Sequence, residues 1–128
     1  MPTTMALQRH AQQLCYDHDI VWRANLSPRA NAFALRVCEE IGTPPIRGAV
    51  SYAVVLHEIG HILSRNQDSR HTMVRERWAW AWARRHALMW TPAMERCAVA
   101  SLAWYAPRAA RLDKRWREPE IPQFGARP

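Results

Sequence analysis

Apolar side chains recur at helical spacing over the first eighteen residues, with polar glutamines and an arginine between them. Positions three and four residues apart lie on one face of an α-helix. The pattern therefore predicts an amphipathic helix over residues 5–18, with a stripe made of Met5, Leu7, Ala11, Leu14, Cys15 and His18. An extended segment is expected next at residues 20–22, and Ser27 with Pro28 marks a turn or a helix start.

Residues 31–41 fit two patterns. Phe33, Leu35 and Val37 alternate with other side chains as they would in a strand, whereas the alanines nearby also suit a helix. Two prolines follow, and a proline disfavours helix in the residue before it. We therefore favour strand or irregular structure in this region, with an extended backbone at Ile46.

Three further helices are expected in the second half of the chain. The most apolar segment predicts a helix that begins between residues 49 and 51 and ends near residue 64 or 65, followed by a polar loop. A second helix is predicted over residues 72–89. Thr91 and Pro92 open a third, because threonine caps helix N-termini and proline suits the first helical position.

The third helix is expected to reach about residue 105, because Pro107 would interrupt it shortly afterwards. A short basic amphipathic helical stretch would then extend over residues 108–117. Residues 118–128 contain three prolines and are expected to form a flexible tail. We accordingly predict one domain over residues 1–117, because a chain of 128 residues with 48% hydrophobic residues can build a single modest core.

The composition narrows the cellular setting. No apolar run reaches the length of a membrane span, and the N-terminal residues lack the apolar core of a signal peptide. The three cysteines, Cys15, Cys38 and Cys97, are an odd number without C-x-x-C spacing. Such cysteines are typical of reduced thiols, so a cytoplasmic protein without a membrane segment is expected.

The net charge of +7 favours either nucleic acid or an acidic partner. Most of the excess lies late in the chain, at Arg84, Arg85, Arg96, Arg108, Arg111, Lys114, Arg115 and Arg117. An arginine-rich solvated face explains the same charge without any partner. Nucleic-acid contact through the basic surface is therefore one hypothesis and a solvated face is the other.

The strongest chemical signal is the H-E-x-x-H pattern at residues 57–61. His57 and His61 lie four residues apart, so on a helix both imidazoles can reach one metal ion. Glu58 is then placed to act on water at the metal. A random order of this composition would give roughly 0.015 such matches per chain. Three polar groups inside an apolar segment would also be costly to bury unless they share a partner such as a metal ion, which indicates a zinc hydrolase helix.

A catalytic zinc site needs a third protein ligand and an open position. Asp68, His71 and Glu76 follow His61 by seven, ten and fifteen residues and are the three candidates. The metzincin pattern is excluded, because it requires glycine where Ser64 stands. We favour Glu76, since a short loop makes the two helices antiparallel neighbours and the small residues near Glu76 allow a close approach.

A peptide-hydrolysing site also needs a donor for the developing oxyanion. Tyr52, His71 and His86 are the candidates, and we favour His71 because it lies on the loop that enters the Glu76 helix. The tryptophans at 78, 80 and 82 cannot form one flat row on a helix, so core packing around the site explains them better than base stacking.

The H-E-x-x-H motif, followed by Glu76-x-x-Ala79-x-x-Trp82-Ala83 and by Leu88, Met89 and Pro92, resembles the ImmA/IrrE family of metallopeptidases. The likeness covers residues 52–92. These are gluzincin-like proteins, frequent in phages and integrative elements. The resemblance implies that His57, His61 and Glu76 bind Zn²⁺ and that Glu58 is the catalytic base.

The resemblance further implies an α+β zincin-like domain, mainly helical, in which a small sheet from residues 20–47 flanks the active-site helix. It implies a zinc metalloendopeptidase whose substrate is a protein or peptide, such as a transcriptional regulator. The alternative is a basic phage DNA-associated or protein-binding module that keeps zinc for structure without turnover. Salt-dependent binding to nucleic acid would favour that alternative.

Overall fold

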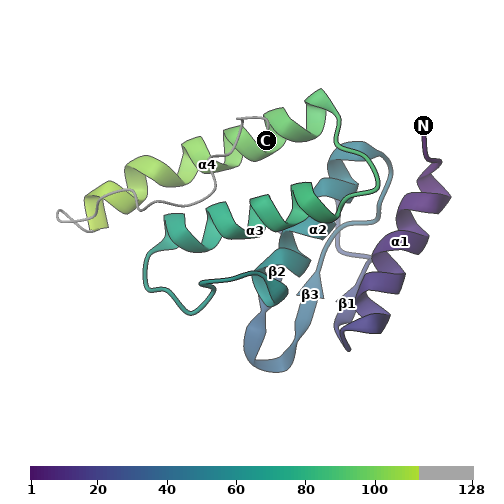
Figure 1. Cartoon of the computed structure of the whole chain (residues 1–128), viewed down its shortest axis with the longest axis horizontal. Coiled ribbons are helices and arrows are strands. Elements are labelled where there is room, and N and C mark those ends of the chain that lie inside the picture. Colours follow the sequence, from purple (N-terminus) through teal and green to yellow (C-terminus); the bar gives the residue numbers. More distant parts are fainter. Residues whose placement is uncertain (113–128) are drawn as a thin grey trace.

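The first predicted helix is confirmed as α1 (Thr4–Asp17) in the computed structural model, which describes residues 1–112 (Figure 1). The hydroxyl of Thr3 caps it by accepting a hydrogen bond from the N–H of Ala6 at 3.1 Å. The predicted stripe is buried at Leu7, Ala11 and Cys15. Burial raises the pKa of the Cys15 thiol to about 11, because a thiolate is disfavoured away from water.

A three-stranded sheet follows, in the order β1-β3-β2. The central strand β3 (Glu40–Gly42) pairs in parallel with β1 (Val21–Arg23) and antiparallel with β2 (Phe33–Leu35). The expected extended segment and the strand interpretation of Phe33 and Leu35 are therefore confirmed. Val37 departs from the alternation, because it lies in the short 3₁₀ helix η1 (Arg36–Cys38) and its side chain is fully exposed.

Helix α2 (Ala49–Leu63) carries the H-E-x-x-H motif, at nearly the predicted bounds. The Ser51 hydroxyl reaches back at its start and accepts hydrogen bonds from the N–H groups of Arg47, at 2.8 Å, and Gly48, at 3.1 Å. The helix contacts α1, the sheet and the two later helices, so it is covered on several sides. This surrounding explains why its sequence is apolar over most of its circumference.

Helix α3 (Thr72–His86) ends three residues before the predicted bound of 89, because the chain turns away after it. Ala87 is extended, and the N–H of Leu88 donates instead to the hydroxyl of Tyr52 at 3.1 Å. Helix α4 (Pro92–Leu112) then runs back along α3 in the opposite direction (Figure 1). The predicted cap is confirmed, since the Thr91 hydroxyl accepts from the N–H of Met94 at 3.2 Å.

The expected interruption at Pro107 is wrong, because α4 continues through this residue to Leu112. A proline inside a helix loses one backbone hydrogen bond and costs about 3 kcal/mol. The helix nevertheless keeps its packing beyond the proline. Ala109 is 8% exposed and belongs to the same core cluster as Met94 and Ala98 on α4. The predicted basic stretch is helical as far as residue 112, whereas its remainder and residues 118–128 lie outside the described residues.

The described residues therefore form an α+β structure that is mostly helical, with four α-helices and one small mixed sheet. The core cluster draws residues from all four helices and from the sheet. None of the helices in residues 1–112 combines the length and the apolar character that a membrane crossing requires.

Candidate metal centre

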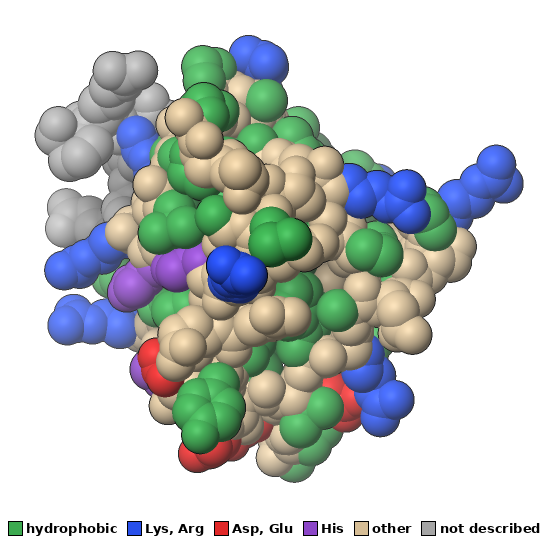
Figure 2. All heavy atoms as spheres, turned by 90° about the vertical axis from the view of Figure 1, so that its right-hand side faces the viewer, with side chains coloured by type: hydrophobic (Ala, Val, Ile, Leu, Met, Phe, Trp, Pro, Cys, Tyr) green, Lys and Arg blue, Asp and Glu red, His purple; other side chains and the backbone are tan. Residues whose placement is uncertain are grey.

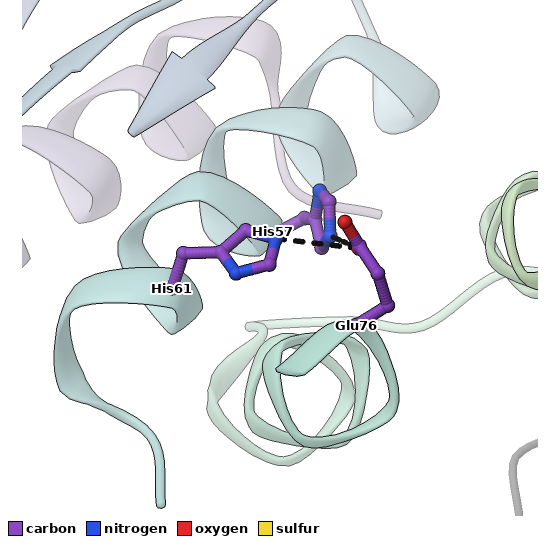
Figure 3. Close-up of side chains that lie close together, drawn as sticks. All are labelled: His57, His61 and Glu76. Atoms are coloured by element: carbon purple, nitrogen blue, oxygen red, sulfur yellow. Dashed lines mark hydrogen bonds and ion pairs between the residues drawn. The ribbon is translucent and has the colours of Figure 1, made fainter. Parts of the chain in front are cut away.

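Two histidines of α2 and one glutamate of α3 point toward one another between these helices (Figure 3). Nε2 of His57 lies 2.7 Å from Oε2 of Glu76, and Nε2 of His61 lies 3.2 Å from the same oxygen. His57 and Glu76 are buried, at 7% and 6% exposure. Within residues 1–112, these three side chains are the group close enough to share one ion, with ligand atoms within 4.8 Å of one another.

The donor set fits a divalent ion. Two imidazole nitrogens and one carboxylate oxygen are the ligands of a three-ligand catalytic zinc site. Zinc bonds of about 2.0–2.2 Å would place ligand atoms roughly 3.3 Å apart on a tetrahedron. The ligand nitrogens of His57 and His61 lie 2.7 Å and 3.2 Å from Oε2 of Glu76, and all three ligand atoms lie within 4.8 Å of one another, which is close enough for one ion to contact them. The described structure therefore contains a buried group that could hold a metal ion.

The close approach of α2 and α3 depends on a glycine inside the motif. A Cβ atom added to Gly60 would lie 2.5 Å from the carbonyl oxygen of Ala79, which is far shorter than a van der Waals contact. Ala79 and Ala83 on α3 are fully buried. The expectation that small residues let the two helices approach is thereby confirmed, and this approach brings Glu76 to the histidines.

The other ring nitrogens of the two histidines have partners of their own. Nδ1 of His57 lies 3.3 Å from Oε1 of Glu58, and Nδ1 of His61 lies 2.9 Å from Oε1 of Gln67. The indole of Trp80 stacks on the His57 ring, with 4.1 Å between centroids and 10° between planes. Both imidazoles are therefore oriented by neighbouring side chains, as is usual for metal-binding histidines.

Charge and burial shift the pKa values of the group. Burial lowers the pKa of His57, but hydrogen bonds to Glu58 and Glu76 outweigh it and raise the pKa to about 9. Burial raises the pKa of Glu76, yet the two histidines bring it well below its usual range. The pKa of Tyr105, on α4, is raised to about 12 by burial and by the charge and hydrogen bonding of Glu76.

Of the candidate third ligands, only Glu76 joins the two histidines in the described structure. Asp68 is exposed in the loop between α2 and α3. His71 occupies the N-cap position of α3, ahead of Thr72, and it is outside the group of ligand atoms. Within residues 1–112 no cysteine belongs to this group.

Two candidate oxyanion donors lie elsewhere. The Tyr52 hydroxyl is bonded to Nδ1 of His10, at 2.6 Å, and to the N–H of Leu88. The His86 ring stacks on Trp82, with centroids 4.1 Å apart, at the end of α3. Tyr52 and His86 are therefore engaged in contacts within the fold. His71 lies at the start of α3.

Two neighbours of the site are missed by sequence reasoning. Gln67 has the pattern of a polar loop residue, although it is only 5% exposed and binds His61. The pattern at Tyr105 predicts only the end of a helix. Tyr105 continues, at helical spacing, the buried face of α4 that includes Met94, Ala98 and Leu102. This spacing is the sequence signal that could have predicted its burial. No comparable signal distinguishes Gln67 from its loop neighbours.

Comparison of this chain with protein-family models, with curated proteins and with solved structures finds no match.

Proposed function

We propose that this chain is a zinc-dependent metallopeptidase-like hydrolase. The observation that supports this proposal is the convergence of His57, His61 and Glu76, contributed by two helices, on one buried point. Chance clustering explains this poorly, because each group needs a partner when it is buried and a shared cation would serve all three. The glutamate of the motif, Glu58, is also buried beside His57.

The same arrangement supports the proposal of a zincin-like domain related to the ImmA/IrrE family. In that proposal α2 is the active-site helix, the small sheet flanks it, and Glu76 comes from the following helix. The order of elements agrees with this expectation, since β1 to β3 precede α2 and α3 follows it. A family relationship would further suggest a protein substrate, such as a transcriptional regulator.

Each side chain would have a distinct part in hydrolysis. A zinc ion held by His57, His61 and Glu76 would lower the pKa of a water molecule to around 7 and polarise the scissile carbonyl. Glu58 would accept the proton of the attacking water as the C–O bond forms, and would deliver it to the amine nitrogen as the C–N bond breaks. Its contact with His57 leaves this capacity intact, because a carboxylate has about four lone-pair sites.

His71 remains the proposed donor to the developing oxyanion. Its position at the N-cap of α3 is five residues before Glu76, close in sequence to one of the proposed ligands. A donor near the carbonyl would stabilise the charge that develops there.

The basic surface gives less support to a nucleic-acid function. On the face drawn in Figure 2, basic side chains stand in several separate places with apolar and neutral side chains between them. Arg84 pairs with Glu95 at 3.7 Å, and Arg108 lies 3.5 Å from the ring centroid of Trp104. These contacts within the chain favour the interpretation of a solvated arginine-rich surface.

The proposal is tested by measuring the metal content of the purified full-length protein. Elemental analysis of wild type, His61→Ala and Glu76→Ala is compared after zinc is supplied and the excess removed, with Asp68→Asn as a matched control from the adjoining loop. We expect about one zinc per chain in wild type and in the control, and loss of zinc in both alanine variants.

Two results would contradict the proposal. Absence of zinc from the wild-type protein would eliminate the metallopeptidase function. Zinc retained in Glu76→Ala would move the third ligand to His71 or Asp68 and remove the arrangement on which the family resemblance depends.

A further inference from the structure

We propose that Gln67 is a positioning residue that sets the orientation and tautomer of His61 and holds the first turns of α3 in place. This inference rests on the proposed metal site and adds a residue to it. Gln67 lies six residues after His61, in the loop that leads from α2 to α3. It is 5% exposed, although residues 65, 66 and 68 beside it are exposed.

The contacts of its nitrogen determine which way the Gln67 amide points. Nε2 of Gln67 donates to the carbonyl oxygen of Arg75 at 2.9 Å, to the hydroxyl of Ser64 at 2.9 Å and toward the carbonyl oxygen of Arg65 at 3.3 Å. A backbone carbonyl can only accept. The NH₂ end of the amide must therefore face Arg75 and Arg65, and the oxygen end must face His61.

This orientation assigns the proton on His61. Oε1 of Gln67 can only accept, so Nδ1 of His61, 2.9 Å away, must carry the hydrogen. In the neutral ring the lone pair then belongs to Nε2, which is the atom that lies 3.2 Å from Glu76. The loop glutamine thus presents His61 to the centre in the tautomer that binds a metal through Nε2.

The same side chain also connects the two helices that supply the ligands. One end of Gln67 holds His61 near the end of α2, and the other holds the carbonyl of Arg75, the residue before Glu76. Arg75 strengthens this connection, since its guanidinium donates to the carbonyl of Ser69 and to the hydroxyl of Thr72, the latter at 3.1 Å. Gln67 therefore affects the spacing between His61 and Glu76.

Two substitutions at position 67 separate the contact of Gln67 with His61 from its contact with the carbonyl of Arg75. Gln67→Met has a similar length and removes both the acceptor and the donors. Gln67→Glu keeps an acceptor for Nδ1 of His61 but removes the donors to Arg75 and Ser64. Asp68→Asn, at the exposed neighbouring position, is the matched control.

Zinc affinity is measured for each full-length variant by competition with a chromophoric chelator, alongside thermal unfolding of the zinc-free protein. We expect Gln67→Met to bind zinc about 10–100-fold more weakly than wild type, as is typical when the partner of a metal-bound histidine is lost. Gln67→Glu should recover most of that affinity while its zinc-free form unfolds at a lower temperature. Equal affinity in wild type and Gln67→Met would overturn the proposal, whatever happens to stability.

The tautomer is measured directly in the wild-type protein, so this test does not depend on how a variant folds. Long-range ¹H–¹⁵N spectra of the zinc-loaded protein identify the ring nitrogen of His61 that carries the proton, because in the zinc-free protein the Glu76 carboxylate, 3.2 Å from Nε2, is a competing acceptor. We expect the proton on Nδ1, and a proton on Nε2 would overturn the proposal. If wild type binds no zinc, the proposed function fails, and thermal unfolding still tests the connection between α2 and α3: a Gln67→Met protein that unfolds at the wild-type temperature would overturn it.

Discussion

The two histidines of the motif are held in the same manner by chemically different partners. Each directs Nε2 toward Glu76, while Nδ1 faces the carboxylate of Glu58 in one case and the amide oxygen of Gln67 in the other. A negative partner makes an imidazole more basic than a neutral one does. The two histidines are therefore not equivalent as proposed ligands. The ring of His57, which is paired with two carboxylates, is the more strongly polarised.

Glu58→Gln tests the proposed base at the scale of one residue. The amide keeps the size of the side chain and an acceptor for His57, but it cannot take a proton from water. We expect zinc content to stay at the wild-type level and hydrolysis of a quenched-fluorescent peptide library to fall by at least about 100-fold. Glu95→Gln is the control, because Glu95, on α4, accepts a hydrogen bond from the indole of Trp90 and does not belong to the ligand group within residues 1–112. Equal hydrolysis by Glu58→Gln and wild type would refute the base assignment.

At the scale of elements, the site depends on how closely α2 and α3 pack. Gly60 faces the backbone of α3 at Ala79, and buried alanines continue that face at Ala83. Larger side chains at these positions would separate the helices and move Glu76 away from the histidines. The glycine of the motif is thus required by packing, in a segment where helix propensity alone would favour alanine.

Gly60→Ala should destabilise the protein, because the added methyl group would lie 2.5 Å from the Ala79 carbonyl oxygen. Alanine is ordinarily better than glycine inside a helix by up to about 1 kcal/mol. Overpacking should reverse that gain and lower the free energy of unfolding by about 1–3 kcal/mol, measured by urea denaturation.

Gly48→Ala provides the comparison for this test. An added Cβ at Gly48 meets no atom within 4 Å, and its φ of 175° is ordinary extended backbone. Because Gly48 is the N-cap of α2, where glycine is preferred to alanine, a loss of no more than about 1 kcal/mol is expected. A Gly60→Ala protein as stable as Gly48→Ala would show that the helices can separate without cost.

A second contact between elements predicts a pH dependence of stability. The Tyr52 hydroxyl on α2 accepts from the N–H of Leu88 and shares a hydrogen bond of 2.6 Å with Nδ1 of His10 on α1. Burial, followed by the charge of His86, lowers the pKa of His10 below its ordinary value of 6.5. The unfolded chain then binds a proton at a higher pH than the folded chain, so stability falls as the pH drops below that ordinary value.

We expect His10→Gln to flatten this dependence, since glutamine can accept from Tyr52 and does not titrate. The measurement is the free energy of unfolding of the zinc-free protein at a series of pH values from neutral to mildly acidic. Wild type should lose more stability than His10→Gln over that range. Parallel curves for the two proteins would show that His10 is not buried in its neutral form.

At the scale of the whole molecule, a bound ion would link folding to metal. Its proposed ligands come from two helices, and α2 is also the helix that contacts α1, α4 and the sheet. Binding to the folded chain alone stabilises it by about 2.7 kcal/mol when free zinc is 100 times the dissociation constant. Each 1 kcal/mol should raise the unfolding midpoint of a chain of this size by roughly 3–5 °C.

Chelation should therefore lower the unfolding midpoint of the zinc-loaded protein by about 10 °C, and added zinc should restore it. Thermal unfolding followed by circular dichroism measures this shift. His61→Ala, which lacks one proposed ligand, should show the same midpoint with and without zinc. An unchanged midpoint for wild type under both conditions would contradict metal binding by the folded chain.

The local features of this chain follow from sequence alone. The stripe at Leu7 and Ala11, the cap at Thr91 and the helix around His57 are set by side chains within a few residues of one another. Helical periodicity also places His57 and His61 on one face whatever the rest of the fold does. The amino-acid sequence is thus sufficient to predict a metal site on this helix and to favour Glu76 as its third ligand.

Only the tertiary structure decided the features that depend on distant segments. Pro107 predicts a helix end, yet the packing of Ala109 against the core extends α4 beyond it. Gln67 has the sequence of an ordinary polar loop, and its role arises because the loop folds back onto His61 and Arg75. Burial and long-range hydrogen bonds are properties of the folded chain, and at these positions they outweigh the local preferences that a sequence pattern reports.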